Sequence, residues 1–163
     1  MWLSKSSVGR KVVMSVTGAA LVLFLLFHMS MNLVAIISTD GYNAICEFLG
    51  ANWYALVGTA GLAALVVLHF VYAFILTLQN RKARGSQRYA VANKTQTESW
   101  AAKNMLVIGV IVLGIVAFHL NHFWADMQLA EWQGHHAANP YDLLNATFQN
   151  WWMVAIYLVW FAA

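Results

Sequence analysis

Three histidines lie inside long apolar segments of the sequence, where a titratable ring is costly. His28 ends the run VTGAALVLFLLFH, His69 lies in LVVLHFVY, and His119 ends VIGVIVLGIVAFH. A glycine precedes two of them by ten residues, Gly18 before His28 and Gly109 before His119. Ionisable side chains in membrane-type segments are rare and usually mark functional sites. These rings are therefore the first candidates for chemistry.

The residues around these histidines limit that chemistry. The charge-free runs contain no Asp or Glu, which proton relays through membranes normally use. A zinc ion takes three or four clustered ligands, and the chain has one cysteine, Cys46. Two neutral imidazoles from facing helices suit the six-coordinate iron of a b-type haem, which is apolar apart from its propionates. The alternative is that each ring is hydrogen-bonded to a neighbouring helix without any cofactor.

The elements that must position these rings are membrane-spanning helices. Of the 163 residues, 61% are hydrophobic and 9% are charged, whereas a soluble domain has about 25% charged residues. A helix needs about 20 apolar residues to cross a bilayer. Charge-free runs predict spans at about 12–38, 53–79 and 103–124, and the start of another at 151–163. Because no stop signal closes the last run, we expect a single transmembrane domain over 1–163 that is truncated at its C-terminus.

The distribution of basic residues predicts the orientation of the spans. All nine Lys and Arg residues lie before the first span or between the second and the third. Segments 40–51 and 123–150 contain acidic residues but no Lys or Arg. Because cytoplasmic loops are enriched in Lys and Arg, we expect the N-terminus and segment 79–103 on the cytoplasmic side.

Helix rise places the histidines at two depths. Counted from the inner face, His28 and His119 lie about 24 and 22 Å in, near the outer face. His69, on a span that runs the other way, lies about 24 Å from the outer face. Gly18 and Gly109 fall near the level of His69. Because glycine has no side chain, a flat macrocycle can approach the helix closely there. The pattern predicts one haem between His28 and His119 and a second at His69, with its other ligand expected at about residue 168.

Three stretches together resemble the diheme cytochrome b anchor of succinate:quinone oxidoreductases, the type with one five-helix anchor subunit. They are SVTGAALVLFLLFHMSMN, LVVLHFVYAFILTLQNRKARGSQRY and IGVIVLGIVAFHLNHFW. The resemblance implies an all-α transmembrane helical bundle that binds two haem b groups between its helices, in a bacterial cytoplasmic membrane. It assigns His28 and His119 to the distal haem and His69 to the proximal haem. The family's fourth ligand, in its fifth helix, has no counterpart in this sequence.

The resemblance also implies a function and partners. Such an anchor carries electrons between a membrane quinone, which we expect to be menaquinone, and an iron–sulfur subunit. That subunit serves an FAD flavoprotein that oxidises succinate or reduces fumarate, so the chain would be a subunit of respiratory complex II with no part in the dicarboxylate chemistry. The resemblance implies no nucleic-acid partner and allows a dimer of the whole complex. The basic residues from Arg81 to Lys103 would dock the iron–sulfur subunit or serve topology alone.

Four polar residues are further candidates. His122, one turn beyond His119, is a candidate contact to a haem propionate or to quinone. Ser30 and Asn32 are candidates to orient a ligand or a propionate, although Ser and Asn also bond within their own helix. Glu47 lies at the outer end of the first hairpin, where the family often has an acid near the quinone, and is a candidate for handling protons there.

Two other functions stay open. A diheme cytochrome b subunit of a quinone-linked hydrogenase or formate dehydrogenase would also bind haem, with a different distribution of histidines. A haem-free transporter or structural membrane protein would use these rings for packing. A visible spectrum separates the last class from the haem proteins.

Overall fold

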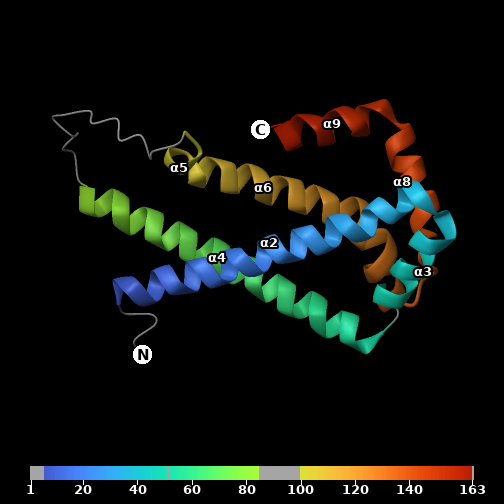
Figure 1. Ribbon diagram of the computed structural model, residues 1–163, viewed down its shortest axis with the longest axis horizontal. Coiled ribbons are helices and arrows are strands. Elements are labelled where there is room, and N and C mark those ends of the chain that lie inside the picture. Colours follow the sequence, from blue (N-terminus) through green and yellow to red (C-terminus); the bar gives the residue numbers. More distant parts are fainter. Residues whose placement is uncertain (1–5, 51, 85–99, 163) are drawn as a thin grey trace.

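The chain folds into an all-α bundle of long helices that are linked by short ones (Figure 1). The computed structural model describes residues 6–50, 52–84 and 100–162. Its long segments are α2 (Ser7–Ile37), α4 (Trp53–Arg84), and a third formed by α6 (Met105–His119), the π-helical η1 (Leu120–Leu129) and α7 (Ala130–Trp132). Its short helices are α3 (Thr39–Gly50), α5 (Trp100–Lys103), α8 (Pro140–Gln149) and α9 (Trp151–Ala162). These ranges contain no β-strand, so the predicted all-α fold is confirmed.

Three helical segments are long and apolar enough to cross a membrane: Val8–Ile37, Trp53–Ala83 and Met105–Trp132. They coincide with the three complete spans that the sequence predicts, although the third continues well past residue 124. Large apolar side chains stay exposed along them, such as Leu23 at 67% and Val67 at 61%. This is the surface expected of helices that face lipid, which is as apolar as the side chains themselves. By length and composition, the chain is a multi-pass membrane protein.

Polar caps explain where several helices begin. Ser6 Oγ accepts a 2.9 Å hydrogen bond from the backbone N–H three residues on and so caps α2. Ser38, between α2 and α3, does the same at 3.0 Å. Asn139 accepts two backbone N–H bonds of 3.1 Å at the start of α8, whose first residue is Pro140. These bonds satisfy backbone N–H groups at the starts of α2, α3 and α8.

The short helices α3 and α8 lie together at one end of the bundle, called here the α3–α8 end (Figure 1). The N-terminus of α2 lies at the opposite end. Asn43 Oδ1 of α3 accepts a 3.0 Å bond from the backbone N–H of Tyr141 in α8. Gln128 of η1 donates to the carbonyl of Gly50 at 2.9 Å. Residues 40–50 and 141–149, between the expected spans, are thus helical, and α3 bonds both α8 and η1.

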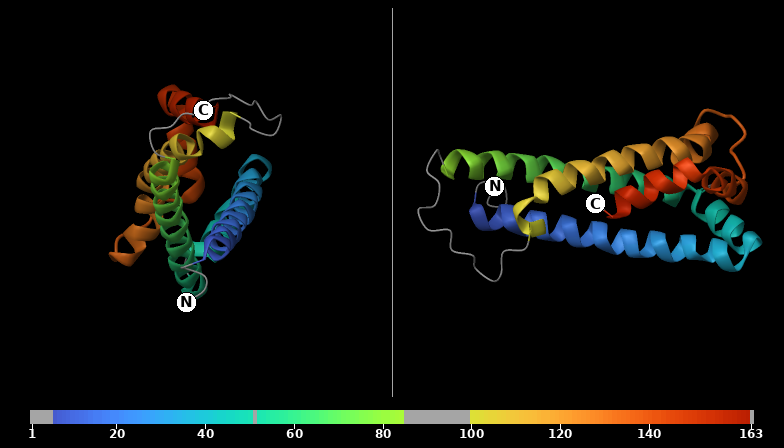
Figure 2. Two further views of the ribbon diagram at one scale, coloured as in Figure 1. Left: turned by 90° about the vertical axis from the view of Figure 1, so that its left-hand side faces the viewer. Right: turned by 90° about the horizontal axis from the view of Figure 1, so that it is seen from above.

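The long helices α2 and α4 cross at an angle, as Figure 1 and the end-on view of Figure 2 show. On one side of the crossing, Arg10 of α2 donates to the side chain of Gln79 in α4. Thr17 of α2 and His69 of α4 also meet across the pair. The sequence therefore places polar groups of α2 and α4 where they find partners on the neighbouring helix.

Candidate functional site

The structure brings the rings of His28 and His119 together from two different long segments. His28 lies on α2 and His119 is the last residue of α6. Their ring centres are 5.6 Å apart and their planes are nearly perpendicular, at 86°. Since a metal–imidazole bond is about 2 Å long, two imidazoles on opposite sides of one metal ion have ring centres about 6 Å apart. The separation of the two ring centres is close to that value, and the rings meet edge-on.

Aromatic rings flank this histidine pair. Phe24, one turn before His28 on α2, stacks on it with ring centres 5.4 Å apart at 22°. Phe123 lies 5.2 Å from His119, at 35°. Phe123 is in turn 6.1 Å from Phe148 of α8. The pair is thus lined by flat apolar groups, which suit an apolar cofactor and keep water away.

Asn32 connects His28 to the α3–α8 end. Its Nδ2 donates to the His28 carbonyl at 2.8 Å and lies 3.4 Å from His28 Nε2. Its Oδ1 accepts from the hydroxyl of Tyr42 in α3 at 3.2 Å, and Tyr42 is only 6% exposed. Because the hydroxyl binds Oδ1, the amide can turn only its NH₂ group toward the His28 ring. The 3.4 Å contact is too long to be a strong hydrogen bond. A metal ion bound at Nε2 would therefore replace only a weak contact.

His69 of α4 contacts two consecutive residues of α2. Its Nδ1 lies 2.8 Å from Thr17 Oγ1, and Thr17 is only 4% exposed. A Cβ built on Gly18 would lie 3.3 Å from His69 Cε1. The sequence predicts Gly18 and His69 at the same depth, and this contact confirms it. Thr17 was not predicted as a site residue, although it stands beside Gly18 in the stretch SVTG.

Three other predicted site residues lie away from these rings or bond locally. Ser30 is exposed, and its hydroxyl donates to the Leu26 carbonyl of its own helix at 2.8 Å. His122 Nδ1 donates to the Phe118 carbonyl at 3.0 Å, because a carbonyl can only accept. Among residues 6–50, 52–84 and 100–162, no neighbouring atom lies within 4 Å of a Cβ built on Gly109. The sequence treats Gly18 and Gly109 as equivalent, but only Gly18 contacts a histidine.

The helix changes its hydrogen-bond register immediately after His119. The ten residues of η1 form a π-helix, a form that is rare and is often found at functional sites. A π-helix turns through a smaller angle per residue than an α-helix. Side chains beyond His119, including those of His122 and Phe123, therefore do not point in the directions that an α-helix of 3.6 residues per turn would give them. Composition carries no signal for such a change.

A polar hollow of about 370 Å³ lies at the α3–α8 end, between α3 and η1. Glu47, a predicted quinone candidate, lines it together with Glu131, Gln128 and Cys46. Glu47 is exposed. Burial raises the pKa of the Cys46 thiol, so this group is protonated at neutral pH. The hollow thus offers two carboxylates and a neutral thiol.

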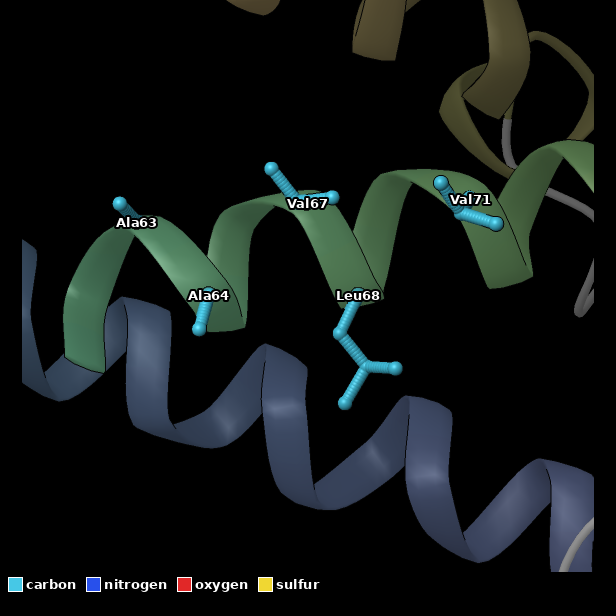
Figure 3. Close-up of a pocket in the computed structure, with 5 residues that line it drawn as sticks. All are labelled: Ala63, Ala64, Val67, Leu68 and Val71. Carbon is cyan, nitrogen blue, oxygen red and sulfur yellow. The ribbon is translucent and has the colours of Figure 1, made fainter. Parts of the chain in front are cut away.

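An apolar hollow of about 480 Å³ lies along α4, close to His69 in sequence (Figure 3). Ala63, Val67 and Val71 line it with two neighbours of the same helix. In Figure 3, Leu68 points toward α2, whereas Ala63 and Val67 point away from it. The residues that line this hollow are all aliphatic, so they offer apolar contacts and no group for acid–base chemistry.

The predicted histidine ligands fall into two places. Within residues 6–50, 52–84 and 100–162, no three His, Cys, Asp or Glu side chains gather into a metal-binding group. Thr17, the partner of His69, precedes His28 by eleven residues on α2, which is about 16 Å of helix. His28 and His119 thus meet in one place, and His69 lies in another, beside Thr17.

Comparisons of the chain with protein-family models, with curated proteins and with solved structures find no match. A function must therefore be argued from the residues of this chain.

Proposed function

We propose that this chain is a membrane-anchor cytochrome b that carries electrons between a membrane quinone and the iron–sulfur subunit of a succinate dehydrogenase or fumarate reductase. One observation supports it above the others. Two imidazoles from separate apolar helices, His28 and His119, lie with their ring centres 5.6 Å apart. No acidic residue lies in the apolar runs that carry them, so haem iron fits this pair better than a proton relay does.

The chain's own residues would have separate roles around two haem groups. His28 and His119 would hold one haem, and His69 would supply a ligand to the other. A bound b-type haem exchanges single electrons, and its potential depends on its ligands and on burial. Phe24 and Phe123, which flank the two rings, would exclude water from the first haem.

Asn32 would act beside these ligands. Its Nδ2 lies 3.4 Å from the His28 ring while bonding the His28 backbone carbonyl, and its Oδ1 is held by Tyr42. Ser30 bonds its own helix, and Gly109 has open space around it. His122 lies three residues beyond His119, in the π-helical η1, and its Nδ1 is already bonded. A propionate contact from His122 would therefore use Nε2.

The basic segment supports the proposed orientation. Arg81 and Lys82 are exposed near the end of α4, whereas most of the predicted docking loop, residues 85–99, lies outside the described residues. An excess of Lys and Arg marks the cytoplasmic side. We therefore propose that the N-terminus lies on the cytoplasmic side, and the resemblance adds a bacterial inner membrane with the iron–sulfur and FAD subunits on that same side.

The quinone site would then lie toward the opposite side. The hollow of about 370 Å³ at the α3–α8 end is within the size range of small-molecule sites. Glu47 and Glu131 line it and could exchange protons with a quinone such as menaquinone. Tyr42, which bonds Asn32, lies on the same helix as Glu47. This arrangement would link the quinone side to the His28–His119 pair.

A visible spectrum of the purified full-length protein tests the proposal. We expect a b-type spectrum with a low-spin α-band on reduction. His28→Ala and His119→Ala should each abolish the same haem, because each removes one axial ligand from one iron. His135→Ala is the matched control, since His135 is an exposed histidine outside the long apolar runs. It should leave the spectrum unchanged.

The possible outcomes separate the competing functions. Loss of different haems in the two variants would refute the pairing of His28 with His119. A protein without any haem would favour a haem-free membrane protein in which these rings only pack. Two haems without binding of iron–sulfur and flavoprotein subunits would favour a cytochrome b of another quinone-linked complex.

A further inference from the structure

We propose that Thr17 is a positioning residue that fixes the tautomer of His69, so that the ring carries its proton on Nδ1 and presents a bare Nε2 to a metal. The identity of that metal as haem iron rests on the proposed function. The tautomer itself follows from the hydrogen bonds of Thr17.

The single hydroxyl proton of Thr17 decides the direction of its bond to His69. Thr17 Oγ1 lies 2.8 Å from the Val13 carbonyl and 3.2 Å from the Met14 carbonyl. A carbonyl only accepts hydrogen bonds, so the hydroxyl proton must be directed to these oxygens. The 2.8 Å contact between Oγ1 and His69 Nδ1 is then satisfied only if Nδ1 carries a proton and donates it to Oγ1.

The opposite arrangement leaves a close contact without a proton. If Thr17 donated to His69 Nδ1, its oxygen would face the Val13 carbonyl at 2.8 Å with no hydrogen between two acceptors. Thr17 is 4% exposed, so water has little access to relieve that contact. Two acceptors buried at this distance without a hydrogen between them are strongly unfavourable. The Nδ1–H tautomer is therefore the one that the site stabilises.

Gly18 limits the freedom of the same ring. A Cβ at this position would lie 3.3 Å from His69 Cε1, so the ring already packs close to the α2 backbone. Within the described residues, no hydrogen bond reaches His69 Nε2. The ring is thus held at Nδ1 and packed at Cε1, while its second nitrogen keeps a free lone pair.

This is the arrangement that a metal-binding histidine uses. Such a histidine almost always donates its other ring N–H to an oxygen, which fixes the tautomer and the ring orientation and raises its basicity. Thr17 would supply that oxygen from the neighbouring helix. His69 would then be prepared for metal before any metal binds.

Nitrogen NMR on the full-length chain, produced without haem and labelled with ¹⁵N-histidine, tests the tautomer directly. The protonated ring nitrogen and the bare one have well-separated shifts, and His69→Gln identifies the signals of His69. We expect the Nδ1–H tautomer in the unaltered chain. An Nε2–H tautomer for His69 there would refute the inference, whether or not the protein binds haem in the cell.

Two substitutions at Thr17 test whether its hydroxyl is the cause. Thr17→Val removes the hydroxyl at nearly constant shape and should remove the Nδ1–H preference, whereas Thr17→Ser should keep it. Thr77→Val is the matched control, because Thr77 bonds the Ala73 carbonyl of its own helix at 2.8 Å and no histidine. It should leave the His69 tautomer unchanged. An unchanged tautomer in Thr17→Val would also refute the inference.

A metal-loaded readout follows with haemin as the probe. Loss of an outer partner of this kind typically lowers metal affinity about 10–100-fold. We expect that loss in Thr17→Val for the haem that depends on His69, with recovery in Thr17→Ser. An equal loss in both Thr17 variants would show a packing role only and overturn the positioning role. Absence of haem binding in every variant, with the Nδ1–H tautomer present, would refute the proposed function and leave the tautomer established.

Discussion

Gly18→Ala tests the packing of His69 against α2, and its magnitude can be worked from the structure. In a helix, replacing Gly by Ala stabilises by about 0.5–1 kcal/mol when the new methyl group has room. At Gly18 the methyl group would lie 3.3 Å from His69 Cε1, which is tighter than ordinary contact. His69 cannot move aside freely because Thr17 holds its Nδ1 at 2.8 Å.

The two effects oppose each other at Gly18. Inserting a methyl group into a packed contact costs about 1–3 kcal/mol, so we expect Gly18→Ala to be neutral or to lose up to about 2.5 kcal/mol. Gly114→Ala is the matched control, since no neighbouring atom lies within 4 Å of a Cβ built there. Gly114→Ala should gain only the helix stabilisation of about 0.5–1 kcal/mol. The two variants should therefore differ by about 1–3 kcal/mol, or about 5- to 150-fold in the unfolding equilibrium constant.

The assay is reversible unfolding of the haem-free chain in mixed detergent micelles by increasing fractions of sodium dodecyl sulfate. Circular dichroism follows loss of helix, and tryptophan fluorescence follows loss of tertiary contacts. A second pair of variants places Gly18→Ala in a His69→Ala background, where the clash has no partner. The deficit of Gly18→Ala should then disappear, as expected for residues in direct contact.

Equal stability of Gly18→Ala and Gly114→Ala would refute the close approach of α2 to His69. A deficit that persists without the His69 ring would assign the effect to another neighbour. Either result would also remove the packing support for a fixed His69 ring.

Three further predictions concern other parts of the chain. Tyr42→Phe removes the 3.2 Å bond to Asn32 Oδ1 and should destabilise the chain by about 0.5–1.5 kcal/mol in the same unfolding assay; an unchanged midpoint would contradict that bond. Burial raises the pKa of the Cys46 thiol, so iodoacetamide should alkylate it more slowly at pH 8 than it alkylates an unstructured peptide thiol. The alkylation rate should increase only at higher pH. Equal rates at pH 8 would contradict this burial. Neutralising Arg81 and Lys82, both exposed, with glutamine should weaken capture of the iron–sulfur and flavoprotein subunits, and salt should mimic the change because exposed charges are screened within about 8 Å; capture that is unchanged at every salt concentration would leave these residues as topology determinants.

The sequence was enough to predict the fold class and which of the main histidines share a level along the bundle. The charge-free runs predicted three long apolar helices, because crossing a bilayer imposes both length and composition. Regular helix rise predicted that His28 and His119 share a level, and their rings lie 5.6 Å apart. The same count predicted that Gly18 and His69 share a level, and the His69 ring itself packs against Gly18. The roles of His28, His69 and His119 as haem ligands stay predictions.

Other features of the site depended on the direction in which each helix faces. Gly18 and Gly109 have the same spacing to a histidine, yet only Gly18 packs against a ring. Spacing along one helix gives depth and relative direction, but it does not say which face meets a neighbour. Crossing angles and rotations are set by packing between helices. For the same reason, the bond from Tyr42 to Asn32 joins two helices in a way that no motif announces.

The amino-acid sequence by itself thus determined that apolar helices carry histidines at two levels, since length, hydrophobicity and helix rise are local properties. Only the tertiary structure decided that Thr17 holds Nδ1 of His69. Only the tertiary structure, likewise, decided that the helix turns into a π-helix directly after His119. A hydrogen bond across helices requires two side chains on different elements to meet, and a change of backbone register reflects the packing of the whole bundle. Neither depends on the composition of one segment alone.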